Sequence, residues 1–180
     1  MIKDKELIAM LQEPRTRREG FAVLVNQYSE QLYWKVRRIV LDHEDANDVL
    51  QNTFVKAWGN LDSFQGKSSL LTWLYRIAVN ESLDFLRKQK AASQVSADEE
   101  PAVAARLMGD PYFDGDEAQA LLQEAIARLP EVQRTVFTMK YFEDLKYSEI
   151  SKILGTSEGA LKASYHLAVK KISDYLHLTE

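Results

Sequence analysis

The 180-residue chain contains no cysteine and few residues that break helices, with only 7 glycines and 4 prolines. Without cysteine, neither a disulfide framework nor a thiolate metal site is possible. The histidines His43, His166 and His177 are not paired at ligand spacing, so the sequence predicts no metal site and no cofactor. Because leucine, alanine, lysine and glutamate are plentiful and suit helices, we expect an all-α protein.

Long apolar runs are also absent. The N-terminal stretch MIKDKELIAML carries charges among its apolar residues, unlike a signal peptide, and no segment approaches the ~20 apolar residues of a membrane span. We therefore expect a cytoplasmic protein without membrane insertion. The formal net charge of -4 argues against a protein that coats nucleic acid non-specifically, although local basic faces can still bind it.

Acidic residues concentrate in the middle of the chain. The segment 91–116 contains six acids against the single cation Arg106, includes two prolines and two glycines, and shows no sustained helical period. We interpret it as an acidic linker between two small helical domains. The predicted boundaries are a first domain at 1–92, the linker at 93–116 and a second domain at 117–180.

Apolar residues recur at helical spacing along the first domain. One long amphipathic helix is expected over 21–39 and a second over 44–58. A loop with the sequence LDSFQGKSS follows, and Ser68 or Ser69 can cap a third helix that extends to about Lys90.

The second domain ends in the outline of a helix-turn-helix. Helices are expected over 118–129 and 131–142, and then a short helix over 147–154 stops at Gly155. Thr156 or Ser157 can cap a last amphipathic helix that extends to about Ile172. A short helix, a glycine-containing turn and a second helix are typical of DNA binding, whereas the alternative is an ordinary helical hairpin. The candidate DNA-binding residues on the last helix are Ser157, Glu158, Gly159, Lys162, Ala163, His166 and Lys170.

A second candidate nucleic-acid surface lies on the third helix of the first domain and on the loop before it. Its residues mix aromatic rings, an amide, hydroxyls and cations, which can stack on bases, contact base edges and pair with phosphates. The loop from Phe64 to Ser69 is interpreted as a pocket for an unstacked base. The alternative is a solvated face with Trp73 half-buried against a neighbouring helix. The candidates are Phe64, Lys67, Ser68, Ser69, Trp73, Arg76, Asn80, Asp84 and Arg87.

The helix expected over 44–58 presents a polar and aromatic surface beside its core stripe. Such a surface is typical of docking to a partner protein. The nearby acids begin a helix, which explains their charge better than a metal site does. No arrangement of residues resembles a catalytic set, so we do not expect an enzyme. The docking candidates are Asp45, Asp48, Gln51, Asn52, Phe54, Val55 and Trp58.

Three motifs together resemble those of the extracytoplasmic-function sigma factors, small two-domain specificity subunits of bacterial RNA polymerase. DANDVLQNTFVKAW is similar to the family's polymerase-binding helix, SSLLTWLYRIAVNESLDFLRK to its -10 helix, and LKYSEISKILGTSEGALKASYHLAVKKI to its -35 helix-turn-helix. The resemblance implies docking on the clamp helices of the polymerase and capture of the melted -10 non-template strand. It also implies duplex contacts at -35, a linker in the RNA channel and an anti-sigma partner.

The sequence departs from the family's pattern in two places. Asn52 stands where relatives usually have an acid, and Ser164, Leu167 and Val169 stand where relatives commonly have arginines. Guanine readout by arginine is therefore largely unavailable to the last helix. Two other hypotheses stay open at this point: a DNA-binding regulator that works without polymerase, and a protein-interaction module without a DNA role.

Overall fold

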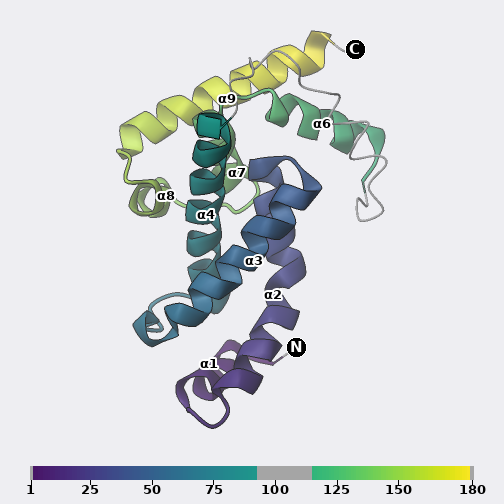
Figure 1. The fold of residues 1–180 in the computed structure, drawn as a ribbon. Coiled ribbons are helices and arrows are strands. Elements are labelled where there is room, and N and C mark those ends of the chain that lie inside the picture. Colours follow the sequence, from purple (N-terminus) through teal and green to yellow (C-terminus); the bar gives the residue numbers. More distant parts are fainter. Residues whose placement is uncertain (1, 93–114, 179–180) are drawn as a thin grey trace. The chain divides into compact units, whose positions relative to one another are not determined.

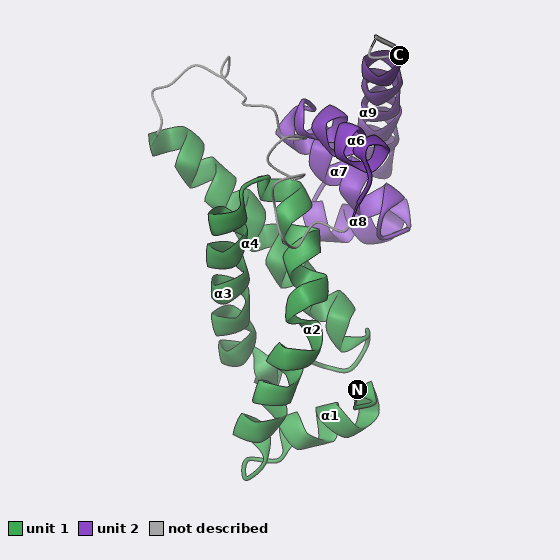
Figure 2. Cartoon of the chain, turned by 90° about the vertical axis from the view of Figure 1, so that its right-hand side faces the viewer, with its two compact units in different colours: residues 1–92 green, residues 93–180 purple. Residues whose placement is uncertain are grey.

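The computed structural model describes residues 2–92 and 115–178, which form helices and contain no β-strand, so the all-α prediction is confirmed. The chain divides into two compact units, residues 1–92 and 93–180 (Figure 2). The predicted linker at 93–116 lies outside the described residues except for Gly115 and Asp116. No helix in the two described ranges is long and apolar enough to cross a membrane.

Three long helices build the first unit, and each contacts the other two (Figure 1). They are α2 (Arg17–Val40), α3 (His43–Gly59) and α4 (Leu70–Ala92), at the places that the sequence predicts. Leucine, isoleucine and valine side chains of all three are fully buried between them, and each contributes about 1.5–3 kcal/mol of burial. Prominent among them are Leu24, Val36, Ile39, Val49 and Leu74.

Side-chain caps fix where two of these helices begin. The Asp42 carboxylate accepts hydrogen bonds from the backbone N–H groups of Glu44 (2.9 Å) and Asp45 (3.2 Å) at the start of α3. The Ser69 hydroxyl accepts from the Thr72 N–H (3.1 Å) at the start of α4, so Ser69 is the cap of that helix. The acidic cluster before α3 thus begins a helix, and the described residues hold no group of acids and histidines arranged for a metal ion.

A short helix that the sequence analysis missed, α1 (Asp4–Gln12), packs across the beginning of α2. Its Asp4 carboxylate accepts a hydrogen bond from the Tyr28 hydroxyl of α2 (2.5 Å) and another from the Leu70 N–H of α4 (3.1 Å). Burial and the bond to Asp4 raise the pKa of Tyr28 to about 12. A Cβ atom at Gly20 would lie only 2.9 Å from the Cβ of Met10, so glycine permits the close approach of α1 and α2.

The second unit contains four described helices around a smaller core. They are α6 (Glu117–Ala127), α7 (Glu131–Tyr141), α8 (Tyr147–Leu154) and α9 (Glu158–Leu178). Ile126, Phe137 and Ala168 are buried at the centre of this unit. Near the end of α9, the Tyr175 hydroxyl donates to the Glu124 carboxylate of α6 (2.9 Å), which joins the first and last of the four described helices.

Candidate nucleic-acid interface

The helices α8 and α9 form the helix-turn-helix that the sequence predicts. Gly155 ends α8 with a φ of 65°, a left-handed conformation that strains any residue with a Cβ atom. The Ser157 hydroxyl then accepts from the Ala160 N–H (3.3 Å) and caps α9. Ile150 and Leu161 are buried between the two helices. This packing fixes the first turns of α9 against α8.

Four of the candidate residues on α9 share one exposed face. Because positions 159, 163, 166 and 170 are spaced three or four residues apart, they lie on one side of the helix, and all four are exposed. Glu158 is also exposed, and Ser157 serves as the cap. Lys162 lies nearer to α8, where its ammonium group is 5.7 Å from the centre of the Tyr147 ring. Lys162 is thereby directed along the flank of the helix-turn-helix, toward α8.

On α4, the candidate surface combines a fixed aromatic end with an exposed polar face. The Trp73 ring is half-buried, and its centre lies 5.1 Å from the centre of the Phe64 ring in the preceding loop. Further along the helix, Arg76 and Asn80 are exposed. The fold therefore places the 64–69 loop beside the beginning of α4, and Trp73 packs on Phe64 of that loop. A joint surface of the loop and the helix requires this proximity.

The last turns of the same face carry an ion pair. Arg87 Nη1 lies 3.1 Å from Asp84 Oδ1 one turn earlier, and both side chains are well exposed. Exposed ion pairs of this kind contribute only about 0.3–0.5 kcal/mol to the free energy of folding. The pair therefore orients Arg87 more than it stabilises the helix. The Arg87 side chain stays exposed to solvent in this pair.

The loop from residue 64 to 69 is exposed over most of its length. Gly66 has a φ of 67°, and Gln65 and Lys67 are exposed. The Ser68 hydroxyl donates to the Ser69 carbonyl (3.3 Å), and the Ser69 hydroxyl is engaged in its cap. Of the residues assigned to base capture, the two serines therefore already have local hydrogen bonds.

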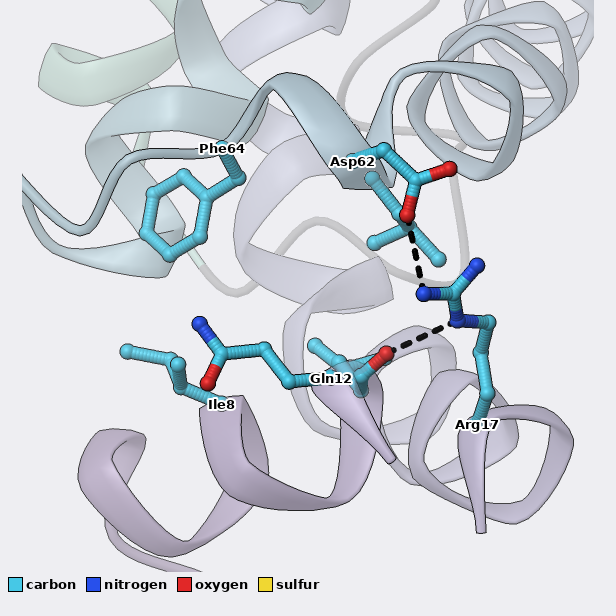
Figure 3. Close-up of a pocket in the computed structure, with 7 residues that line it drawn as sticks. Ile8, Gln12, Arg17, Asp62 and Phe64 are labelled. Carbon is cyan, nitrogen blue, oxygen red and sulfur yellow. Dashed lines mark hydrogen bonds and ion pairs between the residues drawn. The ribbon is translucent and has the colours of Figure 1, made fainter. Parts of the chain in front are cut away.

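A cavity of about 180 Å³ lies beside this loop, between α1, the start of α2 and the 3-10 helix η1 (Leu61–Ser63) (Figure 3). The guanidinium of Arg17 donates to the Asp62 carboxylate (2.8 Å) and to the Leu11 carbonyl (3.0 Å), which fastens one wall. Phe64 is the member of the 64–69 loop that lines this cavity, whereas the sequence analysis expected the whole loop to form a pocket. The lining residues are Ile8, Leu11, Gln12, Arg17, Leu61, Asp62 and Phe64.

Comparison with known proteins gives concordant results for the two units. Residues 24–92 match the family model for sigma-70 region 2, and residues 119–172 match that for sigma-70, region 4. The chain is 31% identical to the ECF RNA polymerase sigma factor SigW of Bacillus subtilis, with 82% of this chain and 84% of that protein covered. It is also 31% identical to the RNA polymerase sigma-H factor of Pseudomonas aeruginosa, with 97% and 94% covered.

The chain belongs to the extracytoplasmic-function sigma factors. The resemblance that rested on three sequence motifs is thereby confirmed, and the chain's function is promoter recognition in transcription initiation. A solved structure agrees in fold: the sigma factor RpoE of Bartonella quintana, in complex with the anti-sigma factor NepR, has a TM-score of 0.71. It is 22% identical, with 90% of this chain and 99% of that chain covered.

On α3 of this sigma factor, most of the docking candidates are exposed. Trp58 is 43% exposed, although its ring packs edge-on against Phe21 of α2 at 5.0 Å. Asp45 is only partly exposed and accepts a hydrogen bond from the Gln89 amide (3.2 Å). Burial, together with the neighbouring Asp42, raises the pKa of Asp45. The remaining exposed candidates are Asp48, Gln51, Asn52 and Val55.

Phe54 was wrongly placed on that exposed surface. Its side chain is only 8% exposed and packs edge-on against Phe21, with the two ring centres 6.5 Å apart. The buried face of α3 is wider than its apolar periodicity predicts. The Phe21 ring of α2 covers the edge of this face, which the sequence pattern alone predicted to be exposed to solvent. Phe54 in this sigma factor therefore supports the exposed surface from below.

The sequence analysis also missed two polar groups of the first unit. The His43 ring at the start of α3 is held between the Tyr33 hydroxyl (2.6 Å) and the Asn47 amide (3.1 Å). On α2, the Lys35 ammonium lies 5.1 Å from the centre of the buried Tyr75 ring. Burial, aided by the charge of Arg38, lowers the pKa of Lys35 to about 8. Neither arrangement has a sequence signal, because each depends on contacts between elements.

Proposed function

We propose that this sigma factor reads promoters at two separate sites while its α3 surface holds core RNA polymerase. The -10 site comprises α4 and the loop before it, and the -35 site comprises the outward face of α9. The observation that carries this proposal is the joint surface on α4, where Trp73 is anchored on Phe64 beside the exposed Arg76 and Asn80.

At the -10 site, single-stranded DNA binds through stacking, amide contacts and charge. Stacking of one base on an aromatic ring contributes about 1–3 kcal/mol, which offsets the few kcal/mol that unstacking costs. Trp73 is suited to this role because its packing on Phe64 fixes the ring before DNA arrives. Asn80 can contact an adenine edge, while Lys67, Arg76 and Arg87 meet phosphates.

On α3, the polymerase-docking surface is centred on Trp58. Exposed aromatic residues supported from below are typical of interface hot spots, and Phe21 and Phe54 support Trp58 here. Around it, Asp48, Gln51, Asn52 and the partly exposed Asp45 form a polar rim, and the exposed Val55 adds an apolar contact. The bond-forming chemistry belongs to the polymerase, since we assign no catalytic site to the sigma factor.

At the -35 site, α9 enters the major groove of duplex DNA. Lys162 and Lys170 contact phosphates, and Ala163 and His166 face the groove. We place this sigma factor in the cytoplasm and propose an anti-sigma factor as the partner that holds it inactive. This proposal is supported by the similar Bartonella quintana sigma factor, whose structure was solved with NepR.

Run-off transcription with core polymerase on genomic fragments tests this function and identifies the promoters. The double variant Arg76→Ala with Asn80→Ala is expected to bind polymerase normally and to lose promoter opening, measured by permanganate reactivity of thymines near -10. Asp48→Ala with Trp58→Ala is expected to lose polymerase binding instead.

Arg18→Ala, at an exposed arginine of α2 outside the residues assigned to the -10 site, is the matched control and should open promoters normally. Undiminished opening in the Arg76 and Asn80 variant would contradict the assigned -10 site. Specific DNA binding without any association with core polymerase would instead favour a regulator that acts alone.

A further inference from the structure

We propose that α9 reads thymine methyl groups in the -35 element through Leu167 and Ala163. This inference rests on the proposed function of the second unit and names what its outward face recognises. The predicted target is a -35 element rich in A·T pairs, in which the thymines matter for their C5-methyl groups.

Leu167 is the observation that leads to this inference. Its side chain is 47% exposed in the middle of α9, although every other leucine of the helix-turn-helix whose burial is described is buried or half-buried. Leu167 lies four residues after Ala163, so their side chains are neighbours on one face. Ala163 is exposed as well. Together they form a small apolar surface on the side of α9 that faces away from the core.

Cations border this apolar surface but do not cover it. Lys170 lies one turn further along the same face and is exposed, whereas Lys162 is turned toward the Tyr147 ring at 5.7 Å. The whole of α9 contains no arginine. Positive charge beside and beyond the apolar surface favours a nearby nucleic-acid backbone, and the floor of the groove then meets Leu167 and Ala163.

The only apolar group that a base presents in the major groove is the thymine C5-methyl. A guanine edge presents two acceptors that neither Leu167 nor Ala163 can satisfy, so pairing this surface with G·C would leave base atoms without partners. Burying one methyl-sized group against an aliphatic side chain is expected to raise affinity about fourfold, which corresponds to about 0.8 kcal/mol. Two such contacts multiply to a preference of about fifteenfold.

Deoxyuridine substitution tests the inference directly, because it removes the methyl group and leaves the base pair unchanged. Run-off transcription first identifies a promoter, and its -35 element is randomised to give a library of duplexes. Holoenzyme made from the full chain and core polymerase then selects the duplexes that it binds. Each thymine of the selected duplex is then replaced by deoxyuridine, and binding is measured by competition. Wild-type holoenzyme is expected to lose about fourfold in affinity at one or two thymines.

Two variants make the test specific to the residue. Leu167→Ala is expected to bind the thymine and deoxyuridine duplexes equally at the position it contacts. Val169→Ala is the matched control, since Val169 is an aliphatic residue of the same helix with 42% exposure but lies on another face. Val169→Ala should keep the full deoxyuridine effect.

Two results would overturn the inference and can be told apart. If every deoxyuridine duplex binds like its thymine parent while scrambling the -35 element still abolishes binding, methyl readout is wrong and the proposed -35 site stands. If scrambling the -35 element leaves holoenzyme affinity unchanged, the proposed role of α9 fails, and the inference fails with it.

Discussion

Removing the Asp4 carboxylate is expected to destabilise the first unit by about 3 kcal/mol, because two hydrogen bonds to a charged group are lost at about 1.5 kcal/mol each. One bond comes from the Tyr28 hydroxyl and the other from the Leu70 N–H at the beginning of α4. We use the lower end of the usual range because Asp4 is partly exposed to solvent. Asp4→Ala therefore weakens the attachment of α1 to both α2 and α4.

Tryptophan fluorescence measures this effect in the full chain. The three tryptophans all lie in the first unit, so their emission reports on its unfolding and not on that of the second unit. Denaturant unfolding of Asp4→Ala should show the lower free energy, while Glu6→Ala, at an exposed position of the same helix, should change it by less than about 0.5 kcal/mol. Combining Asp4→Ala with Tyr28→Phe separates the two bonds, since the pair should couple by about 1 kcal/mol.

The reasoning is refuted if Asp4→Ala and Glu6→Ala unfold at the same denaturant midpoint. In that case α1 is held by its buried leucines alone. A midpoint shift without any coupling to Tyr28 would show that the bond to Leu70 accounts for the whole effect.

Three further changes follow from contacts described above. Tyr175→Phe removes the bond to Glu124 between α6 and α9 and should lower the stability of the second unit by about 1 kcal/mol, measured by far-UV circular dichroism during unfolding. Phe54→Ala should lower the free energy of unfolding of the first unit by about 3 kcal/mol, because the Phe54 side chain is buried. Val55 is 66% exposed, so Val55→Ala should leave the free energy of unfolding unchanged and weaken polymerase binding in a pull-down. Lys35→Met should stabilise the protein below pH 8, and this advantage should vanish between about pH 8 and 10.5 in melting curves recorded across that range. The reason is that the lowered pKa of Lys35 penalises its charged form only in the folded state, so the wild type gains stability as pH rises through that window.

The sequence predicted those parts of the fold that local patterns determine. The helix-turn-helix could be foreseen because Leu161, Ala168 and Ile172 repeat at helical spacing, and because Gly155 and Ser157 mark its turn. The start of α4 followed from its serine cap in the same way. These features depend on residues within a few positions of one another, so a single sequence contains their signal.

Contacts between distant elements could not be foreseen. Asp4 lies 66 residues before its partner Leu70, and α1 is only 9 residues long with its apolar residues in one run, so no repeated helical period marks it. Phe54 was misplaced because its burial depends on Phe21 of another helix. The joint surface of Trp73 and Phe64 was predicted as a set of residues, but the ring contact that fixes it is a tertiary property.

The buried and the exposed positions of α9 have separate roles, which has a practical consequence for engineering. Its buried positions hold the second unit together, while the positions at 159, 163, 166, 167 and 170 are exposed. Under the proposed role of α9, exchanging this exposed set is expected to change which DNA is bound with little loss of stability, because surface substitutions usually change the free energy of unfolding by less than about 0.5 kcal/mol. A set of such α9 variants, each with a different promoter preference, could then control separate genes within one cell without cross-recognition.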